Sequence, residues 1–406
     1  MDKKIDKLDV KTTILLSFGF FGSSLVWQIY NVNVPLILND MALSAVMIGI
    51  IMSIDNFFGV IFQPLFGKLS DKTRTRFGRR LPYLFICMPV SAALFVFIPF
   101  MNTLSSLMIL VIGFTFVMSI WRTPAVSLMP DLTPGKFQSQ ANGIVNLMGG
   151  VGAVIALAGG GLLYNIGGFP LPFAVGGAFL VFAMFILMGF VREPKEATEI
   201  KNTETKEEKA PPMDKIEFKS LLLILSAIFF WFMGYDAVST FFSLYATNIL
   251  GVSAGDASMM LSLFAGMLVL FAVPAGILGA KFGRRRLIMT GLLGISLLFL
   301  PLTFIDNVVL TGVMLFLGGI FWACININSL PMITKIAGPL RIGAFIGYYY
   351  FFSFSSQLIT APIYGFINDF VDNWRSLFVY ACVNFVIALF LMLFVKRGEE
   401  NSPNVN

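Results

Sequence analysis

Charged side chains are scarce in this sequence, and histidine is absent. Only 12% of the 406 residues are Asp, Glu, Lys or Arg, whereas 57% are hydrophobic. Soluble domains carry about a quarter charged residues, so this composition excludes a chain whose surface faces mainly water. Without histidine, any proton that the protein carries must sit on a carboxylate.

Cysteine is rare as well. The three cysteines, Cys87, Cys324 and Cys382, each lie within an apolar run. Isolated thiols in apolar surroundings are typical of core packing, so the sequence predicts neither a disulfide nor a metal site. A nucleotide-binding loop and an ATPase domain are also missing from the sequence, and no cofactor or enzymatic activity is expected.

Long apolar runs recur from one end of the chain to the other. A helix needs about 20 apolar residues to cross a bilayer, whereas a membrane β-barrel would show alternating segments of ~10 residues. The runs do not alternate, so the sequence predicts an all-α membrane protein with twelve transmembrane helices. They are expected at 12–37, 46–66, 81–100, 104–130, 141–165, 170–192, 219–248, 255–280, 287–305, 308–335, 341–366 and 375–396.

The distribution of Lys and Arg predicts the orientation. If both termini are cytoplasmic, the outer loops contain only Arg375 among the 28 Lys and Arg residues. Cytoplasmic loops of membrane proteins carry this excess of positive charge. We therefore expect a multi-pass protein of the plasma (inner) membrane with both termini in the cytoplasm. The net charge of +6 reflects this topology and gives no reason to expect a nucleic-acid partner.

One long hydrophilic segment divides the chain into two sets of six helices. Its mixed charge and lack of apolar residues are typical of a linker. The predicted organisation is a cytoplasmic tail at 1–11, a six-helix bundle at 12–192, a cytoplasmic linker at 193–218, a second six-helix bundle at 219–396 and a cytoplasmic tail at 397–406.

The two sets of helices carry signs of an internal repeat. "RFGRR" at Arg76–Arg80 returns as "KFGRR" at Lys281–Arg285, 205 residues later. The same offset carries Tyr30-Asn31 onto Tyr235-Asp236. Near offset 202, "SLMP" at Ser127–Pro130 meets "SLPM" at Ser329–Met332. Three matches at similar spacing predict a duplicated six-helix bundle, whose copies are related by an axis along the membrane normal.

The loop "GKLSDKTRTRFGRR", Gly67–Arg80, resembles the loop between helices 2 and 3 of the major facilitator superfamily. Its longer form, followed by "LPY", resembles sucrose transporters and the glycoside–pentoside–hexuronide cation symporters, as does "TPAVSLMPDLTPGKFQSQANG" at 123–143. The resemblance implies two pseudo-symmetric six-helix bundles and transport by alternating access. It also implies a cytoplasmic gate made by Gly67, Asp71, Gly78, Arg79, Arg80 and, at the end of helix 4, Asp131.

The same loop also has a simpler interpretation, because arginines in a cytoplasmic turn satisfy the charge rule without forming a gate. In the second half the corresponding stretch is "GILGAKFGRR", where Ala280 stands in place of the acidic residue. The sequence therefore predicts a weaker gate contact in the second half.

Three charged residues lie deep within predicted helices: Asp55, Arg122 and Asp236. Each costs roughly 2.5–3.5 kcal/mol at a helix centre, so such residues normally face a cavity or one another. Asp55 and Arg122 belong to the same half and have opposite signs. We expect them to form a pair that takes part in coupling, the alternative being a static salt bridge that holds the helices together.

Coupling to a proton is favoured over coupling to sodium. "SIDNFFG" at 53–59 resembles the helix-2 stretch of melibiose permease that carries two cation-coordinating acids. Asp55 takes the place of the first acid, but Gly59 stands where the second is found, so a sodium site would lack a ligand. Arg122 also stands near where that permease carries an acid.

Aromatic and amide side chains within helices 1, 4, 7 and 10 suggest a sugar site, since a sugar stacks on aromatic faces while its hydroxyls bind polar groups. In the resembled superfamily these four helices line the central cavity. Packing between helices would explain each residue taken alone. The candidate substrate-binding residues, including one from helix 11, are Trp27, Gln28, Tyr30, Asn31, Trp121, Arg122, Trp231, Tyr235, Asp236, Trp322, Asn326, Asn328 and Gln357.

These observations predict a monomeric secondary transporter that carries a disaccharide or glycoside together with a proton. Protonation of Asp55 would loosen its pairing with Arg122 and free the guanidinium for sugar, while Asp236 would be a second titrating group or a hydroxyl acceptor. Two alternatives stay open: a proton-coupled exporter of hydrophobic or cationic compounds, and a sodium-coupled sugar symporter.

Overall fold

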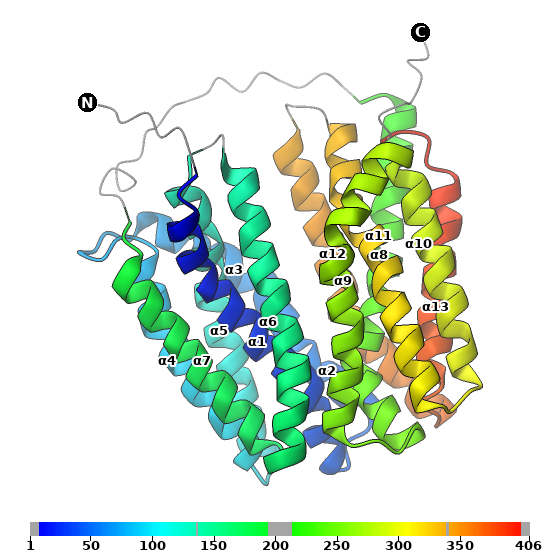
Figure 1. Cartoon of the computed structure of the whole chain (residues 1–406), viewed down its shortest axis with the longest axis horizontal. Coiled ribbons are helices and arrows are strands. Elements are labelled where there is room, and N and C mark those ends of the chain that lie inside the picture. The colour runs from blue at the N-terminus through cyan, green and yellow to red at the C-terminus, as the bar shows by residue number, and fades with distance from the viewer. Residues whose placement is uncertain (1–7, 135–136, 194–212, 338–340, 399–406) are drawn as a thin grey trace. The chain divides into compact units, whose positions relative to one another are not determined.

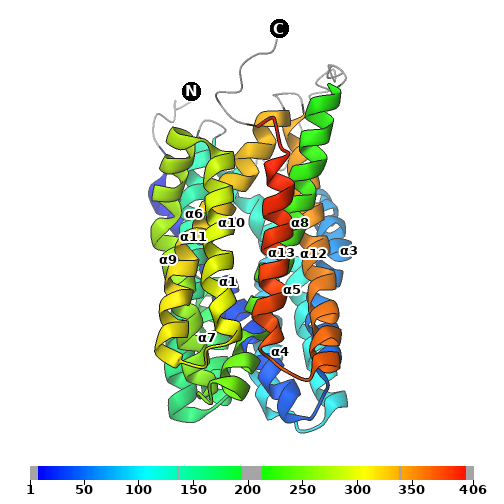
Figure 2. The same ribbon diagram turned by 90° about the vertical axis from the view of Figure 1, so that its right-hand side faces the viewer.

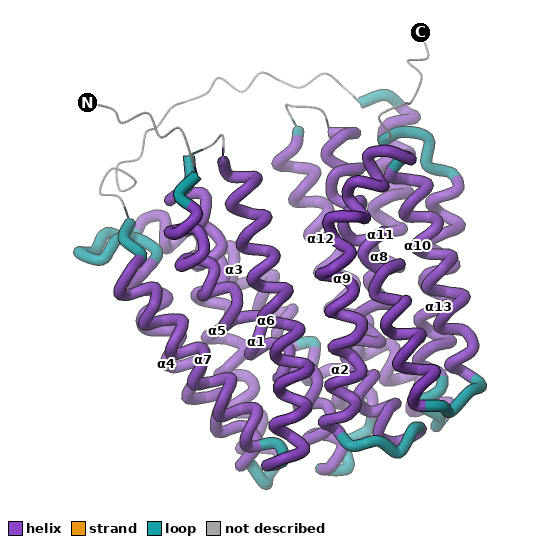
Figure 3. The backbone as a smooth tube through the Cα atoms, in the orientation of Figure 1, coloured by secondary structure: helices purple, strands orange, loops and turns teal. Residues whose placement is uncertain are grey.

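The computed structural model describes residues 8–134, 137–193, 213–337 and 341–398. Throughout these residues the regular structure is helical, apart from one isolated bridge between Thr75 and Gly78. Figure 3 shows the helices joined by short loops. The predicted linker at 193–218 falls largely outside the described residues, as do most of the two predicted tails.

The chain divides into two compact units, which are described one at a time. The first comprises Met1–Ile37, Ile54–Thr203 and Ala254–Ser262. Within it, α3 and α4 pack against α5, and α4 also packs against α7, as Figure 1 shows for the last pair. Its helices are α1 (Val10–Asp40, without its last turn), α3 (Ile54–Lys72), α4 (Leu81–Phe97), α5 (Leu104–Leu132), α6 (Gln138–Gly167), α7 (Pro170–Phe190) and the first turns of α9 (Ala254–Phe282).

The second unit comprises Leu38–Ser53, Glu204–Ser253 and Leu263–Asn406. Its central contacts are those of α8 with α12 and α13, and of α10 with α11 and α13 (Figure 2). Its helices are α2 (Ala45–Met52), α8 (Lys215–Ile249), the remainder of α9, α10 (Arg284–Phe299), α11 (Val308–Ala337), α12 (Ile342–Val371) and α13 (Ser376–Leu393).

The helices agree with the predicted spans. Eleven helical segments are long and apolar enough to cross a membrane, with α2 and α3 together counted as one. The twelfth predicted span corresponds to α12, a helix of 30 residues that contains the more polar stretch "YYYFFSFSSQ". Many large apolar side chains are exposed, among them Phe370 at 85% and Ile166 at 78%, as expected of helices that face lipid.

Local signals in the sequence set where the helices begin. Thr103 precedes α5, and its side chain accepts a hydrogen bond from the Ser106 N–H, which would otherwise lack a partner at the helix start. Asp214 and Glu217 form a capping box at the start of α8, four residues earlier than the predicted span. A proline stands at the start of α4 and of α7, where its missing N–H costs nothing.

The second span is broken, which the sequence analysis did not foresee. α2 ends at Met52 and α3 begins at Ile54, and the Ser53 hydroxyl donates back to the Gly49 carbonyl at 2.8 Å. Such back-bonding by serine bends helices. The two pieces belong to different compact units, so the units depart from the predicted bundles 12–192 and 219–396 both at α2 and at the start of α9.

The start of α9 packs closely on α6 within the first unit. Gly161 and Gly255 approach so closely that a Cβ on either would overlap the other's carbonyl oxygen. The Ser258 hydroxyl donates to the Leu157 carbonyl at 2.8 Å, and Asn165 Nδ2 donates to Asp256 Oδ1 at 3.0 Å. These contacts hold the first turns of α9 against α6.

Cys87, Cys324 and Cys382 are free and buried, which confirms that they serve in packing. Among the described residues, no group of three or more His, Cys, Asp or Glu side chains is placed to hold a metal ion.

Candidate functional site

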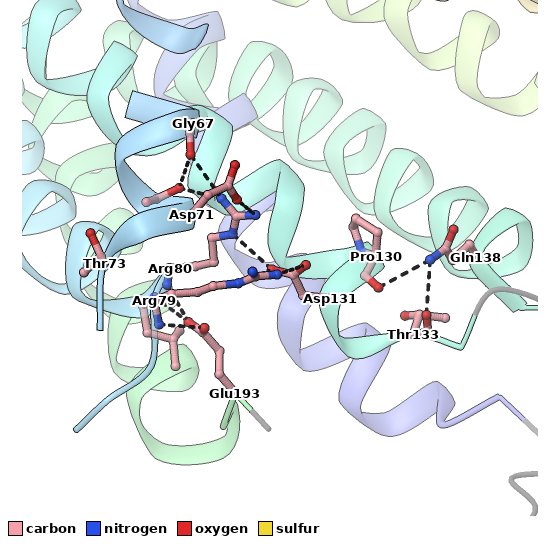
Figure 4. Close-up of polar contacts among 12 residues, drawn as sticks. Gly67, Asp71, Thr73, Arg79, Arg80, Pro130, Asp131, Thr133, Gln138 and Glu193 are labelled. Carbon is pink, nitrogen blue, oxygen red and sulfur yellow. Dashed lines mark hydrogen bonds and ion pairs between the residues drawn. The ribbon is translucent and has the colours of Figure 1, made fainter. Parts of the chain in front are cut away.

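Two arginines and one carboxylate form the centre of a charge cluster at one end of the first unit (Figure 4). Arg79 Nη2 lies 2.5 Å from Asp131 Oδ1, and Arg79 Nε donates to Asp131 Oδ2 at 3.2 Å. Arg80 Nε also donates to Asp131 Oδ2, at 3.0 Å. Asp131, in the last turn of α5, thus joins that helix to the two residues that precede α4. The side chains are 6–17% exposed, so water screens these contacts only in part.

The same Arg80 side chain also fixes the end of α3. Its Nη2 lies 2.5 Å from Asp71 Oδ1, and its Nη1 donates to the Ser70 hydroxyl at 2.5 Å and to the Gly67 carbonyl at 3.4 Å. Gly67 is required by the packing, since a Cβ there would approach the Thr123 methyl to 2.9 Å. One guanidinium therefore connects the ends of α3 and α5.

Glu193, two residues after the cap of α7, completes the charge cluster. Its two carboxylate oxygens accept hydrogen bonds from the backbone N–H groups of Arg79, Arg80 and Leu81 at 2.7–2.8 Å (Figure 4). These N–H groups lie at the start of α4, where a helix leaves donors unsatisfied and favours negative charge. Gly78 has a φ of +112°, and a Cβ there would lie 2.6 Å from the Glu193 carboxyl carbon, so only glycine fits.

In the second unit, the repeated arginines bind backbone carbonyls. Arg284 Nη1 donates to the Pro331 carbonyl at 3.1 Å. Arg285 donates through Nε to Met392 and through Nη2 to Leu393, at 3.0 and 2.7 Å, and so caps the end of α13. Ala280 stands where the first half has Asp71. The partners in the second repeat are therefore neutral, whereas those in the first repeat are carboxylates.

The structure brings together all six residues predicted for the gate: Gly67, Asp71, Gly78, Arg79, Arg80 and Asp131. The sequence analysis missed Glu193 and Ser70. The first backbone N–H groups of a helix need acceptors, so an acceptor could be expected at the start of this helix. Nothing in the sequence identifies which of the nearby acidic residues provides it.

Asp55 is the second residue of α3, two residues after the break at Ser53. Asp55 Oδ1 accepts a hydrogen bond from Asn56 Nδ2 at 3.0 Å. Arg122, on α5, interacts electrostatically with the Asp55 carboxylate, and so does the buried Tyr30 on α1. The two opposite charges predicted to pair therefore lie within reach of each other in the first unit. The Arg122 side chain is exposed and Asp55 is half-buried.

An aromatic cluster adjoins this pair. Trp27, Tyr30 and Phe114 lie with ring centroids 5.3–5.6 Å apart. Trp27 Nε1 and the Tyr30 hydroxyl are buried atoms that find no hydrogen-bond partner among the described residues. A buried donor without a partner costs free energy, so these two groups are available to a polar molecule that reaches them.

Three of the four tryptophans predicted to face the cavity are instead packed inside the bundles. Trp121, Trp231 and Trp322 are at most 1% exposed. Trp121 Nε1 donates to Ser91 on α4 at 3.3 Å, so it points toward a neighbouring helix. Trp322 stacks in parallel on Tyr235, with centroids 4.3 Å apart. Their burial corrects the expectation that they offer an accessible aromatic face in this structure.

Asn328 also serves in packing. Its Nδ2 donates to the carbonyls of Ala275 and Cys324 at 3.1 and 3.0 Å, which joins α11 to α9. Tyr30 is fully buried, so only a molecule that enters the bundle would reach its hydroxyl. The remaining predicted substrate-binding residues are half-buried: Trp27, Gln28 and Asn31 in the first unit, and Tyr235, Asp236, Asn326 and Gln357 in the second.

Asp236 lies on α8 beside two tyrosines. It interacts electrostatically with Tyr235, its neighbour in sequence, and with Tyr380 on α13. Tyr235 faces Trp322 on α11, so the successive residues Tyr235 and Asp236 lie near different helices. The aromatic stack and the carboxylate therefore have different surroundings within the second unit.

Comparison with known proteins identifies the family. The sequence profile of the Major Facilitator Superfamily matches residues 16–254 and 224–406. A bacterial homologue of the human lysosomal transporter Spinster, in an inward-facing and occupied conformation, has a similar fold, with a TM-score of 0.78 at 18% identity over 96% of this chain and 97% of that one.

Two curated relatives match smaller parts of this chain. Multidrug resistance protein 1 of Bacillus subtilis is 26% identical over 292 residues, 69% of each chain. An uncharacterized symporter from Synechocystis is 35% identical over 80 residues, which span 20% of this chain and 15% of the symporter. The family and the fold are those of membrane transporters, and the chain is a multi-pass integral membrane protein that belongs to the Major Facilitator Superfamily.

Proposed function

We propose that this transporter couples the movement of its substrate to a proton carried by Asp55. The observation that carries the proposal is the proximity of Asp55 and Arg122, two opposite charges within helices of one unit. Each charge costs roughly 2.5–3.5 kcal/mol in a membrane helix, so evolution retains such residues mainly where they act.

The proposed coupling step follows from charge neutralisation. When Asp55 takes up a proton, it loses its attraction for Arg122, and the guanidinium becomes able to donate hydrogen bonds to substrate. When the proton leaves, the carboxylate recovers the guanidinium and the substrate is released. The exposed position of Arg122 supports this exchange, because its side chain does not have to be extracted from a packed core.

The substrate that we propose is a sugar, carried in the same direction as the proton. Support comes from the resemblance to sugar symporters and from the half-buried amide groups of Gln28 and Asn31, on the helix that carries Trp27. The unpartnered Trp27 Nε1 is a donor suited to a hydroxyl oxygen. The packing roles of Trp121, Trp231, Trp322 and Asn328 leave fewer residues for this site than the sequence suggested.

Proton-coupled export of hydrophobic cations is the second candidate. Phe58, Phe62 and Phe116 form a cluster of edge contacts with centroids 5.0–5.7 Å apart, and Phe58 lies one turn beyond Asp55 on α3. An acid beside aromatic rings suits an organic cation. The similarity to Multidrug resistance protein 1 also supports this candidate.

We further propose that the charge cluster forms the cytoplasmic gate and that both termini lie in the cytoplasm. The excess of Lys and Arg in the loops on the predicted cytoplasmic side, which include the loop of Arg79 and Arg80, supports this orientation. Asp131 would fix the ends of α3, α4 and α5 as one body that moves together during transport.

Uptake into proteoliposomes tests the coupling. Labelled disaccharide should accumulate under an acid-outside pH gradient, in sodium-free buffer as well as with sodium. Asp55→Asn should abolish accumulation and leave sugar exchange intact, whereas Asp40→Asn, at the end of α1, should retain accumulation. Undiminished accumulation by Asp55→Asn excludes the proposal. Gradient-driven movement of a lipophilic cation with no sugar uptake would favour the exporter.

A further inference from the structure

The helix that carries Asp55 has one more polar side chain within its apolar part. Between Asn56 and Lys68, Gln63 is the only residue of α3 with a polar side chain. Gln63 is half-buried, and its amide has no hydrogen-bond partner among the described residues. An amide without a partner is costly in hydrocarbon, so its presence indicates a polar space beside this part of α3.

The Gln63 amide lies over Gly59, on the side of Asp55. A Cβ built on Gly59 would lie 3.0 Å from Gln63 Nε2. Apart from the backbone of α3 itself and the two adjoining residues, no other described residue comes within 4 Å of that Cβ position. Asp55, Gly59 and Gln63 follow one another at a spacing of four, so each lies beside the next on the helix surface. From Gly59 to Asp55 the helix rises about 6 Å, a gap that one or two water molecules can bridge.

Pro64 provides a second polar group in the same turn. Proline has no N–H, so the Val60 carbonyl, four residues earlier, loses its usual helical donor. In membrane helices, carbonyls freed by proline bind ordered water or neighbouring side chains. Val60 is 45% exposed, so other helices do not cover this turn. A carbonyl that accepts and an amide that both donates and accepts are together suited to hold water beside Gly59.

The groups that face Asp55 cannot take its proton. Arg122 on α5 and Tyr30 on α1 interact electrostatically with the carboxylate, and Asn56 Nδ2 donates to Asp55 Oδ1 at 3.0 Å. The guanidinium and the phenol are already protonated at neutral pH, and an amide is not basic. A proton that leaves Asp55 therefore needs water as its acceptor.

We propose that Gln63, together with the Val60 carbonyl, positions the water that exchanges the proton of Asp55. This inference rests on the proposed role of Asp55 as the proton carrier. In the step, the O–H bond of the Asp55 carboxylic acid breaks and its proton passes to the adjacent water. A second water then takes a proton from the first, toward the end of α3 that carries the charge cluster, and the Asp55 carboxylate recovers Arg122. Gln63 is a positioning residue, because its amide orients the water and is itself unchanged.

Infrared spectroscopy after a pH jump tests the inference on the full-length protein in proteoliposomes, without any substrate. The carboxylic acid band that is missing from Asp55→Asn identifies the group that titrates. Gln63→Leu should slow the loss of this band about ten-fold, the size expected when one hydrogen bond that orients the water is removed. Gly59→Ala should slow it as well, because the added Cβ displaces the Gln63 amide.

Matched variants separate the amide from packing. Gln140→Leu makes the same replacement at an exposed position of α6, and Gly189→Ala adds to α7 a Cβ that meets nothing within 4 Å. Neither should change the rate of deprotonation. Gln63→Asn keeps an amide in the same turn and should be slowed less than Gln63→Leu. A native rate in Gln63→Leu, or equal slowing in the Asn and Leu variants, overturns the inference.

The same measurement distinguishes this inference from the proposed function. If no titrating band is lost in Asp55→Asn, Asp55 is not the proton carrier and both proposals fail. If the band is lost there but Gln63→Leu deprotonates at the native rate, only the role of Gln63 fails.

Transport gives an independent readout of the proton step. Under an acid-outside gradient, Gln63→Leu should accumulate labelled disaccharide more slowly, whereas sugar exchange at equal pH, which needs no deprotonation, should stay at the native rate. Replacing H2O by D2O should slow accumulation by Gln63→Leu more than accumulation by the native protein, because proton transfer has become the slow step. An equal solvent isotope effect in the two proteins would assign the loss to packing and reject the role of Gln63.

Discussion

Asp131 is shared by two guanidinium groups, with Arg79 Nη2 at 2.5 Å from one oxygen and Arg80 Nε at 3.0 Å from the other. The contact joins α5 to the start of α4, and Asp131 is only 14% exposed. Two cations in one small volume repel each other unless a carboxylate lies between them. Asp131 therefore has both a structural and an electrostatic role.

Asp131→Asn is expected to lower the free energy of unfolding by about 2–4 kcal/mol, because both arginines lose a largely buried counter-charge. Unfolding can be followed in detergent with a thiol-reactive dye that detects exposure of the three buried cysteines, Cys87, Cys324 and Cys382. The matched control is Asp306→Asn, which breaks the more exposed ion pair with Arg375 and should cost less than about 1 kcal/mol. Equal losses in the two variants would contradict the role assigned to Asp131.

Glu193→Gln should loosen the start of α4. The amide keeps one acceptor oxygen but loses the charge and presents N–H groups to backbone N–H donors, so about 1–2 kcal/mol of stability should be lost. Hydrogen exchange at Arg79, Arg80 and Leu81 should accelerate. Unchanged exchange there would mean that the three backbone contacts contribute nothing to the stability of the helix start.

Trp322→Ala should cost about 3–5 kcal/mol, because it removes a fully buried ring that stacks on Tyr235 and leaves a cavity. Trp322→Phe should retain much of that stability. The distinguishing measurement is substrate affinity in the Phe variant, which should match that of the native protein if Trp322 serves in packing. A large fall in affinity with native stability would return Trp322 to the substrate site.

Gly279→Ala should destabilise the contact between α9 and α11. The added Cβ would overlap Asn328 Oδ1, whose side chain is held by two hydrogen bonds, and overpacking of this kind costs about 1–3 kcal/mol. Gly266→Ala lies on the same helix and meets nothing within 4 Å, so it should be neutral or stabilise by up to about 1 kcal/mol. A thermal-melting comparison of the two variants that found equal Tm values would disprove the close approach.

Much of the fold could be predicted because apolar run length has a direct physical meaning in a bilayer. The positions of the helices followed from the lengths of the apolar runs. The gathering of Arg79, Arg80 and Asp131 was implied by the resemblance of the loop to that of the superfamily. The break at Ser53 could not be predicted, because serine within an apolar run is compatible with both a straight and a bent helix.

The direction in which each side chain points could not be predicted from the sequence either. Trp121 lies next to Arg122, yet the first is buried against Ser91 and the second is exposed, since successive residues on a helix point about 100° apart. Counting tryptophans per helix ignored this rotation. Glu193 was missed for a related reason: it acts on the backbone of a segment more than a hundred residues away, and no spacing in the sequence reports that.

The arginines of the two repeats respond differently to their surroundings because their partners differ. Arg79 and Arg80 bind carboxylates, so dissolved salt can partly screen these contacts. Arg284 and Arg285 bind carbonyl oxygens that carry no net charge and do not titrate. A change in ionic strength therefore weakens the contacts of one repeat more than those of the other, which gives a duplicated protein an asymmetric sensitivity to the salt around it.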